Sequence, residues 1–158
     1  MAQGGLRNGE TMPDPSGSSS LAAPATGTGS TGAAGILPTM MREMLQAKLH
    51  RGIITEVRFD YEGSLTIDPD LYEQCGMAEY QKIQVLNANN GYRLETYVIS
   101  GRRGSREICV NGPAARHAMK GDRVVVCAYC LVDERELPTF TPHVLVLDER
   151  NEVVSSHR

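Results

Sequence analysis

The sequence contains no long apolar run, no excess of basic residues and no segment with the pattern of a secretory signal. A membrane-spanning helix needs about 18 or more consecutive apolar residues, and a signal peptide needs a basic start before an apolar core. Because neither pattern occurs, we expect a cytoplasmic protein that does not bind a membrane. The formal net charge of −3 offers no basic surface to a polyanion, so we also expect no nucleic-acid partner.

Cysteines are too few for a disulfide scaffold, and the common catalytic motifs are absent. Four cysteines in 158 residues suit reduced thiols. Cys127 and Cys130 have the spacing of half a zinc site, but they lie in the apolar run 124–131, which is typical of a buried strand. Residues three apart on a strand point to opposite faces, so we expect no metal site there. The sequence also lacks a Gly-rich phosphate loop, a His-Glu-x-x-His motif and a Gly-x-Ser-x-Gly motif.

The composition predicts one folded domain between two extensions. Residues 1–39 consist largely of Gly, Ser, Thr, Ala and Pro without periodicity, which predicts a disordered low-complexity extension. This segment is either a docking arm or an inert extension, and translation that starts at Met40 or Met41 would remove it. We expect the folded domain over residues 40–132 and a C-terminal extension over residues 133–158 that can form a hairpin.

Short strands dominate the predicted secondary structure. Apolar alternation and β-branched residues predict strands over 45–50, 53–59, 65–67, 82–87, 92–99, 107–110 and 124–131, and a last hairpin from 144–147 to 153–154. Asn90-Gly91 predicts the turn between the strands 82–87 and 92–99. These features favour a mainly β fold, either a small barrel or a sandwich.

Two short helices interrupt the strands. Asp68 is a good N-cap, Pro69 suits the first helical position, and Gly76 suits the left-handed residue after the last turn. These signals predict a helix over 69–75. A second short helix is expected to begin near Pro113.

Several polar residues fall on predicted strands or at turns. Structure alone can account for each of them, since lysine and arginine can be solvated strand charges, tyrosine a half-buried core residue and asparagine a turn former. Taken singly, none of these residues indicates a function. The set is Lys48, His50, Tyr61, Ser64, Arg93, Thr96, Tyr97 and Asn111.

The dipeptide Gly63-Ser64 differs from other Gly-Ser pairs because it lies between two predicted strands, whereas the copies at 17–18 and 29–30 lie in low-complexity sequence. With its surroundings it resembles the pyruvoyl-dependent aspartate 1-decarboxylases. The matching blocks are MLQAKLHR at 44–51, DYEGSLTID at 60–68, NNGYRLETY at 89–97, RGS at 103–105 and NGPAA at 111–115. Separate blocks in one order are far more specific than a single motif.

The resemblance implies a small six-stranded double-psi β-barrel with short helices. It implies a homotetramer of processed α and β chains, with active sites between neighbouring subunits. The implied reaction converts L-aspartate to β-alanine and CO2 and supplies pantothenate and coenzyme A. The implied cofactor is a pyruvoyl group made from Ser64 by cleavage after Gly63, which forms a Schiff base with the substrate and replaces PLP or a metal. Cleavage is either spontaneous or assisted by a maturation factor.

The chemistry explains these residue types. Loss of CO2 leaves a carbanion that no protein side chain can delocalise, so an electron sink is required. By resemblance, Thr96 assists cleavage and Tyr97 donates a proton to the decarboxylated intermediate. Arg93 matches the anchor of a substrate carboxylate, which a guanidinium can hold in a bidentate fork. Further substrate-binding positions are Lys48, Tyr61, Asn111, Gly112, Pro113 and Ala114.

Two features of the chain depart from the family pattern. Pro113 stands where alanine is common, which removes one backbone N–H near the site. Residues before 40 and after about 131 extend beyond the expected family core.

Thr96 and Tyr97 are adjacent on a strand and should face opposite sides, so a bend or a position at the barrel rim is needed for both to act. A non-catalytic β-barrel module and a pyruvoyl decarboxylase of another amino acid are the alternative functions.

Overall fold

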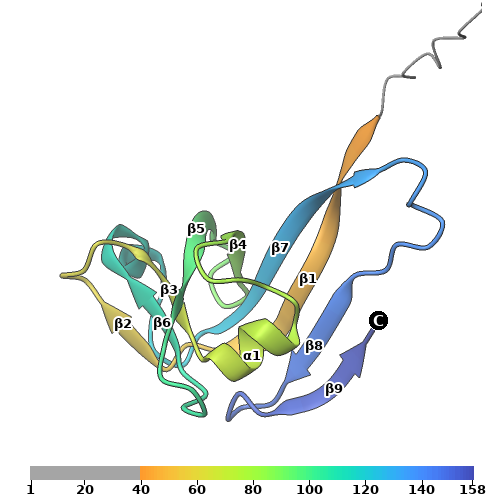
Figure 1. Cartoon of the computed structure of the whole chain (residues 1–158). Coiled ribbons are helices and arrows are strands. Elements are labelled where there is room, and N and C mark those ends of the chain that lie inside the picture. Colours follow the sequence, from red (N-terminus) through yellow and green to blue (C-terminus); the bar gives the residue numbers. More distant parts are fainter. Residues whose placement is uncertain (1–39) are drawn as a thin grey trace, which may run out of the picture. The chain divides into compact units, whose positions relative to one another are not determined.

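The computed structural model describes residues 40–158, and the extension predicted over residues 1–39 lies outside this range. Within the described range the chain forms nine strands, one α-helix and one 3-10 helix (Figure 1). The strands are β1 (Met41–Ile53), β2 (Glu56–Arg58), β3 (Ser64–Ile67), β4 (Lys82–Asn87), β5 (Arg93–Ser100), β6 (Ile108–Asn111), β7 (Arg123–Asp133), β8 (His143–Leu147) and β9 (Val153–His157). The helices are α1 (Pro69–Gln74) and the 3-10 helix η1 (Gly112–His117).

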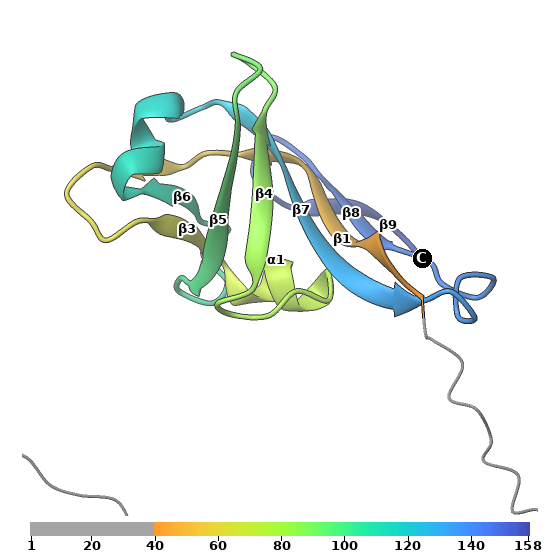
Figure 2. The ribbon, with the colours of Figure 1, turned by 90° about the horizontal axis from the view of Figure 1, so that it is seen from above.

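The nine described strands form one hydrogen-bonded sheet in the order β2-β6-β3-β5-β4-β7-β1-β8-β9. Figure 2 shows β4 and β5 between the β3-β6 pair and the long strands β7 and β1. Three neighbouring pairs are parallel, namely β2 with β6, β3 with β5 and β1 with β8. The predicted mainly β fold is therefore confirmed, whereas the nine strands of this part of the chain do not confirm the six-stranded barrel that the resemblance implies.

Alternating side chains of the strands build the core. On β1, Ala47 and Leu49 are buried, while Gln46, Lys48 and His50 lie on the other face and are partly exposed, as their alternation predicts. Burying one large aliphatic side chain stabilises a fold by about 1.5 to 3 kcal/mol. The largest fully buried side chains are Leu49, Ile54, Leu65, Ile67, Leu71, Ile83, Ile108, Leu145, Leu147, Val98, Val110 and Val124.

The strand predicted over 53–59 is confirmed only in part, because the chain changes partners at its start. Ile53 is the last residue of β1 and pairs with Arg123 of β7. The next residues turn toward β6, where the Thr55 backbone N–H donates to the carbonyl of Ile108 at 2.8 Å. Strand β2 then covers only Glu56–Arg58. The run of β-branched residues is thus divided, since Ile53 ends β1, Val57 lies in β2 and residues 54–55 belong to neither strand.

Helix α1 begins and ends close to the predicted positions. Pro69 occupies the first turn, and Asp68 accepts the backbone N–H of Asp70 at 3.0 Å. Gly76 has a φ of 82° just after the helix, in the left-handed region that favours glycine.

The buried carboxylate of Asp68 also joins α1 to the loop before β6. It accepts the backbone N–H groups of Gly104 at 3.0 Å and Arg106 at 2.7 Å. Burial acts to raise the pKa of Asp68, but these backbone donors, that of Asp70 and the charge of Arg106 outweigh it, so the pKa is lowered. The buried Asp68 carboxylate therefore holds the basic loop 102–106 through its backbone.

Both predicted hairpins are confirmed. Strands β4 and β5 pair antiparallel around Asn90-Gly91, and Gly91 has a φ of 76°. Strands β8 and β9 also pair antiparallel, and β8 pairs with β1 on its other side. Because Leu145 and Leu147 are fully buried, the C-terminal hairpin contributes to the same core as the rest of the sheet. None of the helices within residues 40–158 has the length and apolar character needed to span a membrane.

Candidate active site

Gly63-Ser64 lies where the loop after β2 enters β3, and its backbone is strained. Gly63 has a φ of 96° and Ser64 a φ of 140°. A serine rarely adopts a positive φ, and such a conformation costs about 1 to 3 kcal/mol and persists only where the surrounding structure enforces it. Ser64 is also 1% exposed, so the strained peptide is held in a nearly closed environment.

A buried amide holds the Ser64 hydroxyl. Strand β6 pairs antiparallel with β3, and this register places Asn111 opposite Ser64. The Asn111 Nδ2 donates to the Ser64 Oγ at 2.9 Å and to the Thr66 Oγ1 at 2.8 Å. Asn111 is fully buried, and its Oδ1 accepts the Cys109 thiol at 3.4 Å. The hydroxyl of Ser64 is thus fixed by a network that spans two strands.

The carbonyl of Gly63 is the acceptor of a second side chain. The Tyr97 hydroxyl donates to the Gly63 carbonyl oxygen at 3.2 Å. The resemblance assigns help in cleavage to Thr96, but in the described part of the chain the hydroxyl that binds this carbonyl belongs to Tyr97. A hydroxyl donor at this oxygen can stabilise negative charge that develops on it.

The first residue of η1 requires glycine. Gly112 has a φ of 63°, and a Cβ added to it would lie 2.6 Å from the Gly63 nitrogen and from the Tyr61 carbonyl oxygen. Both neighbours are backbone atoms, which cannot rotate away. The close approach of Gly112 therefore fixes the loop that carries the Gly63-Ser64 peptide.

Most predicted site residues gather around one depression of about 320 Å³. Thr96 and Tyr97 both contribute to it, although Tyr97 is 38% exposed and Thr96 belongs to the inward-facing set of β5. The two residues can thus serve one site despite their alternation. The lining residues are Glu62, Gly63, Ser64, Glu95, Thr96, Tyr97, Asn111, Pro113 and Ala114.

Arg93, Lys48 and Tyr61 do not line this depression. Arg93 shares the exposed face of β5 with Glu95 and Tyr97, but it lines a separate depression beside the β4-β5 turn. Tyr61 is 47% exposed on the loop after β2. A single chain therefore brings together the residues predicted for cleavage but not the predicted carboxylate anchor Arg93 or Lys48.

The pairing of the strands shows how many strands separate Lys48 from Glu95, which lines the depression at Ser64. Lys48 pairs with Cys127, Cys127 with Gln84, and Gln84 with Glu95, so these four residues form one row across the outer face. Neighbouring strands lie about 4.8 Å apart, which places Lys48 about 14 Å from Glu95. Lys48 therefore lies outside the lining of the depression at Ser64 of its own chain.

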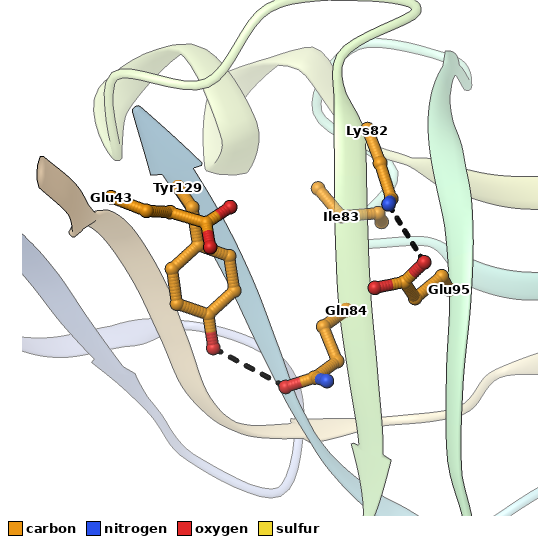
Figure 3. Close-up of a pocket in the computed structure, with 6 residues that line it drawn as sticks. All are labelled: Glu43, Lys82, Ile83, Gln84, Glu95 and Tyr129. Atoms are coloured by element: carbon orange, nitrogen blue, oxygen red, sulfur yellow. Dashed lines mark hydrogen bonds and ion pairs between the residues drawn. The ribbon is translucent and has the colours of Figure 1, made fainter. Parts of the chain in front are cut away.

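A second depression lies on the outer face of the sheet, beside the depression at Ser64. Figure 3 shows this second depression, in which Lys82 forms an ion pair with Glu95 at 2.7 Å and the Tyr129 hydroxyl donates to the Gln84 Oε1 at 3.2 Å. Glu95 lines both this depression and the one at Ser64. The two depressions are thus neighbours on one continuous face of the sheet.

Two members of the Asn111 network are not among the site residues that the sequence predicts. Thr66 and Cys109 are paired residues of β3 and β6, two positions from Ser64 and Asn111 respectively. Residues two apart on a strand share a face. That periodicity is the signal that would have found both residues.

The carboxylates near Cys109 are already paired. Glu56, Glu107 and Cys109 offer ligand atoms within 4.8 Å of one another. The Arg58 guanidinium, however, bonds Glu56 at 2.7 Å and Glu107 at 3.1 Å. This cluster is accounted for as an ion-pair network on the described part of the chain.

Comparison with known proteins agrees with the geometry of the site. A family model described as aspartate decarboxylase matches residues 40–154, so the match includes β8 and the start of β9, which we expected to lie outside the family core. Proteins named aspartate 1-decarboxylase from Clostridium kluyveri and Bacillus cereus are each 49% identical to this chain, over 114 and 115 residues. The alignments cover 72% and 73% of this chain and 90% and 91% of the relatives.

A third relative of the same name comes from another bacterium. The protein from Ralstonia pickettii is 48% identical over 114 residues, which are 72% of this chain and 95% of the relative. The family match over residues 40–154 includes the Gly63-Ser64 site. This chain belongs to the aspartate decarboxylase family.

Proposed function

We propose that this protein is a self-cleaving decarboxylase that converts L-aspartate to β-alanine and CO2 with a pyruvoyl group derived from Ser64. The names of the relatives support the substrate and the reaction. The observation that carries the proposal is the buried Ser64 hydroxyl beside a Gly63 carbonyl that accepts the Tyr97 hydroxyl. A held nucleophile and a polarised carbonyl on neighbouring residues are what an acyl shift requires.

In the proposed cleavage, the Ser64 Oγ attacks the Gly63 carbonyl carbon and forms a C–O bond. The C–N bond breaks and the hydroxyl proton passes to the released nitrogen, so that the peptide becomes an ester. Tyr97 stabilises the oxyanion at the Gly63 oxygen. Loss of the Ser64 Cα proton then breaks the bond from Cβ to the ester oxygen, which leaves a Gly63 carboxylate and dehydroalanine. The Cβ of the dehydroalanine then takes up a proton and becomes a methyl group, and water adds to the resulting imine carbon and releases the nitrogen as ammonia, which leaves the pyruvoyl group.

The residues around Ser64 suit such a group. Its carbonyl would supply the electron sink for the loss of CO2. Tyr97, whose hydroxyl already reaches the cleavage point at 3.2 Å, is proposed to give a proton to the product carbon. Asn111 and Ala114 form part of the wall at this position.

The substrate anchors are proposed to come from a neighbouring subunit. Arg93 and Lys48 lie on the outer face of the sheet, away from Ser64 of their own chain. A guanidinium and an ammonium there would bind the two carboxylates of aspartate. The proposal therefore includes a homotetramer with shared active sites. It also includes the double-psi β-barrel, a cytoplasmic location and a supply of β-alanine for pantothenate, all of which the resemblance implies.

The mass of the purified protein tests the cleavage directly. We expect two fragments that separate between Gly63 and Ser64, with a blocked N-terminus on the larger one, and release of CO2 from L-aspartate. Ser64→Ala should remain one folded chain without turnover. Ser105→Ala is the matched control, because Gly104 also has a positive φ of 75° before a serine, and it should cleave as wild type does.

The outcomes separate clearly. A wild-type chain that stays whole and inactive after incubation with an extract of the source cells, which would contain any maturation factor, would contradict the proposal. Turnover by Ser64→Ala would contradict the pyruvoyl group while leaving the substrate assignment intact. A panel of aspartate, glutamate and cysteic acid tests the substrate, and a preference for either of the others would replace aspartate.

A further inference from the structure

Two buried residues next to Ser64 have no part in the chemistry proposed above. Thr66 is 6% exposed on β3, and Cys109 is 0% exposed on β6. Both contact Asn111, since the Asn111 Nδ2 donates to the Thr66 Oγ1 at 2.8 Å and the Cys109 thiol donates to the Asn111 Oδ1 at 3.4 Å. Neither contacts Ser64 through a hydrogen bond in the described part of the chain.

The network uses both ends of the Asn111 amide. An asparagine side chain has two N–H donors and one oxygen acceptor. Its two donors are directed to the hydroxyls of Ser64 and Thr66. The Cys109 thiol stays protonated at neutral pH, because burial raises its pKa to about 11, so it remains a donor to the Oδ1.

This arrangement gives the amide one orientation. If the amide rotated by half a turn, its NH2 group would face the thiol hydrogen of Cys109, and one N–H would lose a good acceptor. The present orientation keeps an N–H directed at the Ser64 Oγ, 2.9 Å away. A donor at this oxygen favours the charge that develops as the hydroxyl gives up its proton.

We propose that Thr66 and Cys109 are positioning residues for self-cleavage, which hold the Asn111 amide so that its Nδ2 donates to the Ser64 Oγ. The inference rests on the proposed function, because it concerns the bond that forms between the Ser64 Oγ and the Gly63 carbonyl carbon. Neither residue touches the reacting atoms. Their effect passes through Asn111, and this indirect route distinguishes them from a catalytic residue.

The test measures the rate at which the whole chain splits, by intact mass at intervals after synthesis. Thr66→Val keeps the shape of the side chain and removes the hydroxyl, and it should slow cleavage by about tenfold or more, the effect of one hydrogen bond worth about 1.4 kcal/mol. Thr66→Ser restores the hydroxyl and should cleave at close to the wild-type rate. Thr55→Val is the matched control, because the Thr55 hydroxyl also bonds to β6, at Ile108, but lies outside the network.

A double variant separates positioning from a general loss of structure. If Thr66 acts through Asn111, Thr66→Val should add little to the slow cleavage of Asn111→Ala. Cleavage of Thr66→Val as fast as that of Thr55→Val would overturn the inference, as would fully additive effects. If the wild-type chain never splits after Gly63, the proposed function itself fails, which is a different result.

Cys109 provides an independent variant if Thr66→Val does not fold. Cys109→Ala removes the donor to the Asn111 Oδ1, whereas Cys109→Ser keeps a hydroxyl donor at nearly the same position. We expect the alanine variant to cleave more slowly than the serine variant. Equal rates, in variants with equal urea midpoints, would show that the donor does not position the amide.

Discussion

Replacing Gly112 by alanine tests whether the approach of two backbone segments holds the cleavage site together. The new Cβ would meet the Gly63 nitrogen and the Tyr61 carbonyl oxygen at 2.6 Å, and the Gly63 Cα at 2.7 Å. The φ of 63° adds about 1 to 2 kcal/mol for a residue with a Cβ, and forced displacement of packed atoms adds about 1 to 3 kcal/mol. We expect a loss of about 2 to 5 kcal/mol in the free energy of unfolding.

The same substitution should also slow self-cleavage, because the loop must move and Gly63 carries the attacked carbonyl. Stability is measured by urea unfolding in the Ser64→Ala background, where the chain stays whole. Gly76→Ala is the matched control, since Gly76 has a φ of 82° but no atom within 4 Å of an added Cβ. It should lose about 1 to 2 kcal/mol and leave cleavage unchanged. If both variants behave alike, the close approach at Gly112 does not constrain the site.

Two further predictions concern substrate binding and stability. Arg93→Ala should still cleave but lose aspartate turnover by about tenfold to a hundredfold, the value of a charge-assisted anchor of about 1.5 to 3 kcal/mol, and turnover within twofold of wild type would remove Arg93 from the site. Asp68 has a lowered pKa in the folded chain, so its contribution to stability is present above pH 4 and is lost as the pH falls through the folded-state pKa. Asp68→Asn in the Ser64→Ala background should therefore lower the urea midpoint at pH 6. It should also reduce the loss of stability that occurs between pH 6 and pH 3. The control Glu73→Gln removes an exposed ion pair with Arg103 and should change the free energy of unfolding by less than about 1 kcal/mol. An unchanged midpoint in Asp68→Asn would show that the buried carboxylate does not hold the loop at Gly104 and Arg106.

Local signals predicted the elements that depend on neighbouring residues alone. The cap at Asp68, the proline at position 69 and the glycine at position 76 fixed helix α1 to within a residue of its observed end. The turn at Asn90-Gly91 and the alternation along β5 were equally readable, because both are set by backbone preference and by the period of two. The strand predicted over 53–59 is interrupted because Ile53 pairs with β7 whereas residues 56–58 pair with β6, and partner choice leaves no local pattern.

The site divides in the same way. The sequence by itself determined the Gly63-Ser64 dipeptide, its likeness to a family and the residue types that the proposed chemistry needs, because these follow from order along the chain. Only the tertiary structure decided that Tyr97 contacts the Gly63 carbonyl, that Asn111 holds the Ser64 hydroxyl, and that Thr66 and Cys109 complete the network. The physical reason is strand register. Strands β3 and β6 lie far apart in the sequence, and their pairing brings the side chains of Ser64, Thr66, Cys109 and Asn111 together in a buried space.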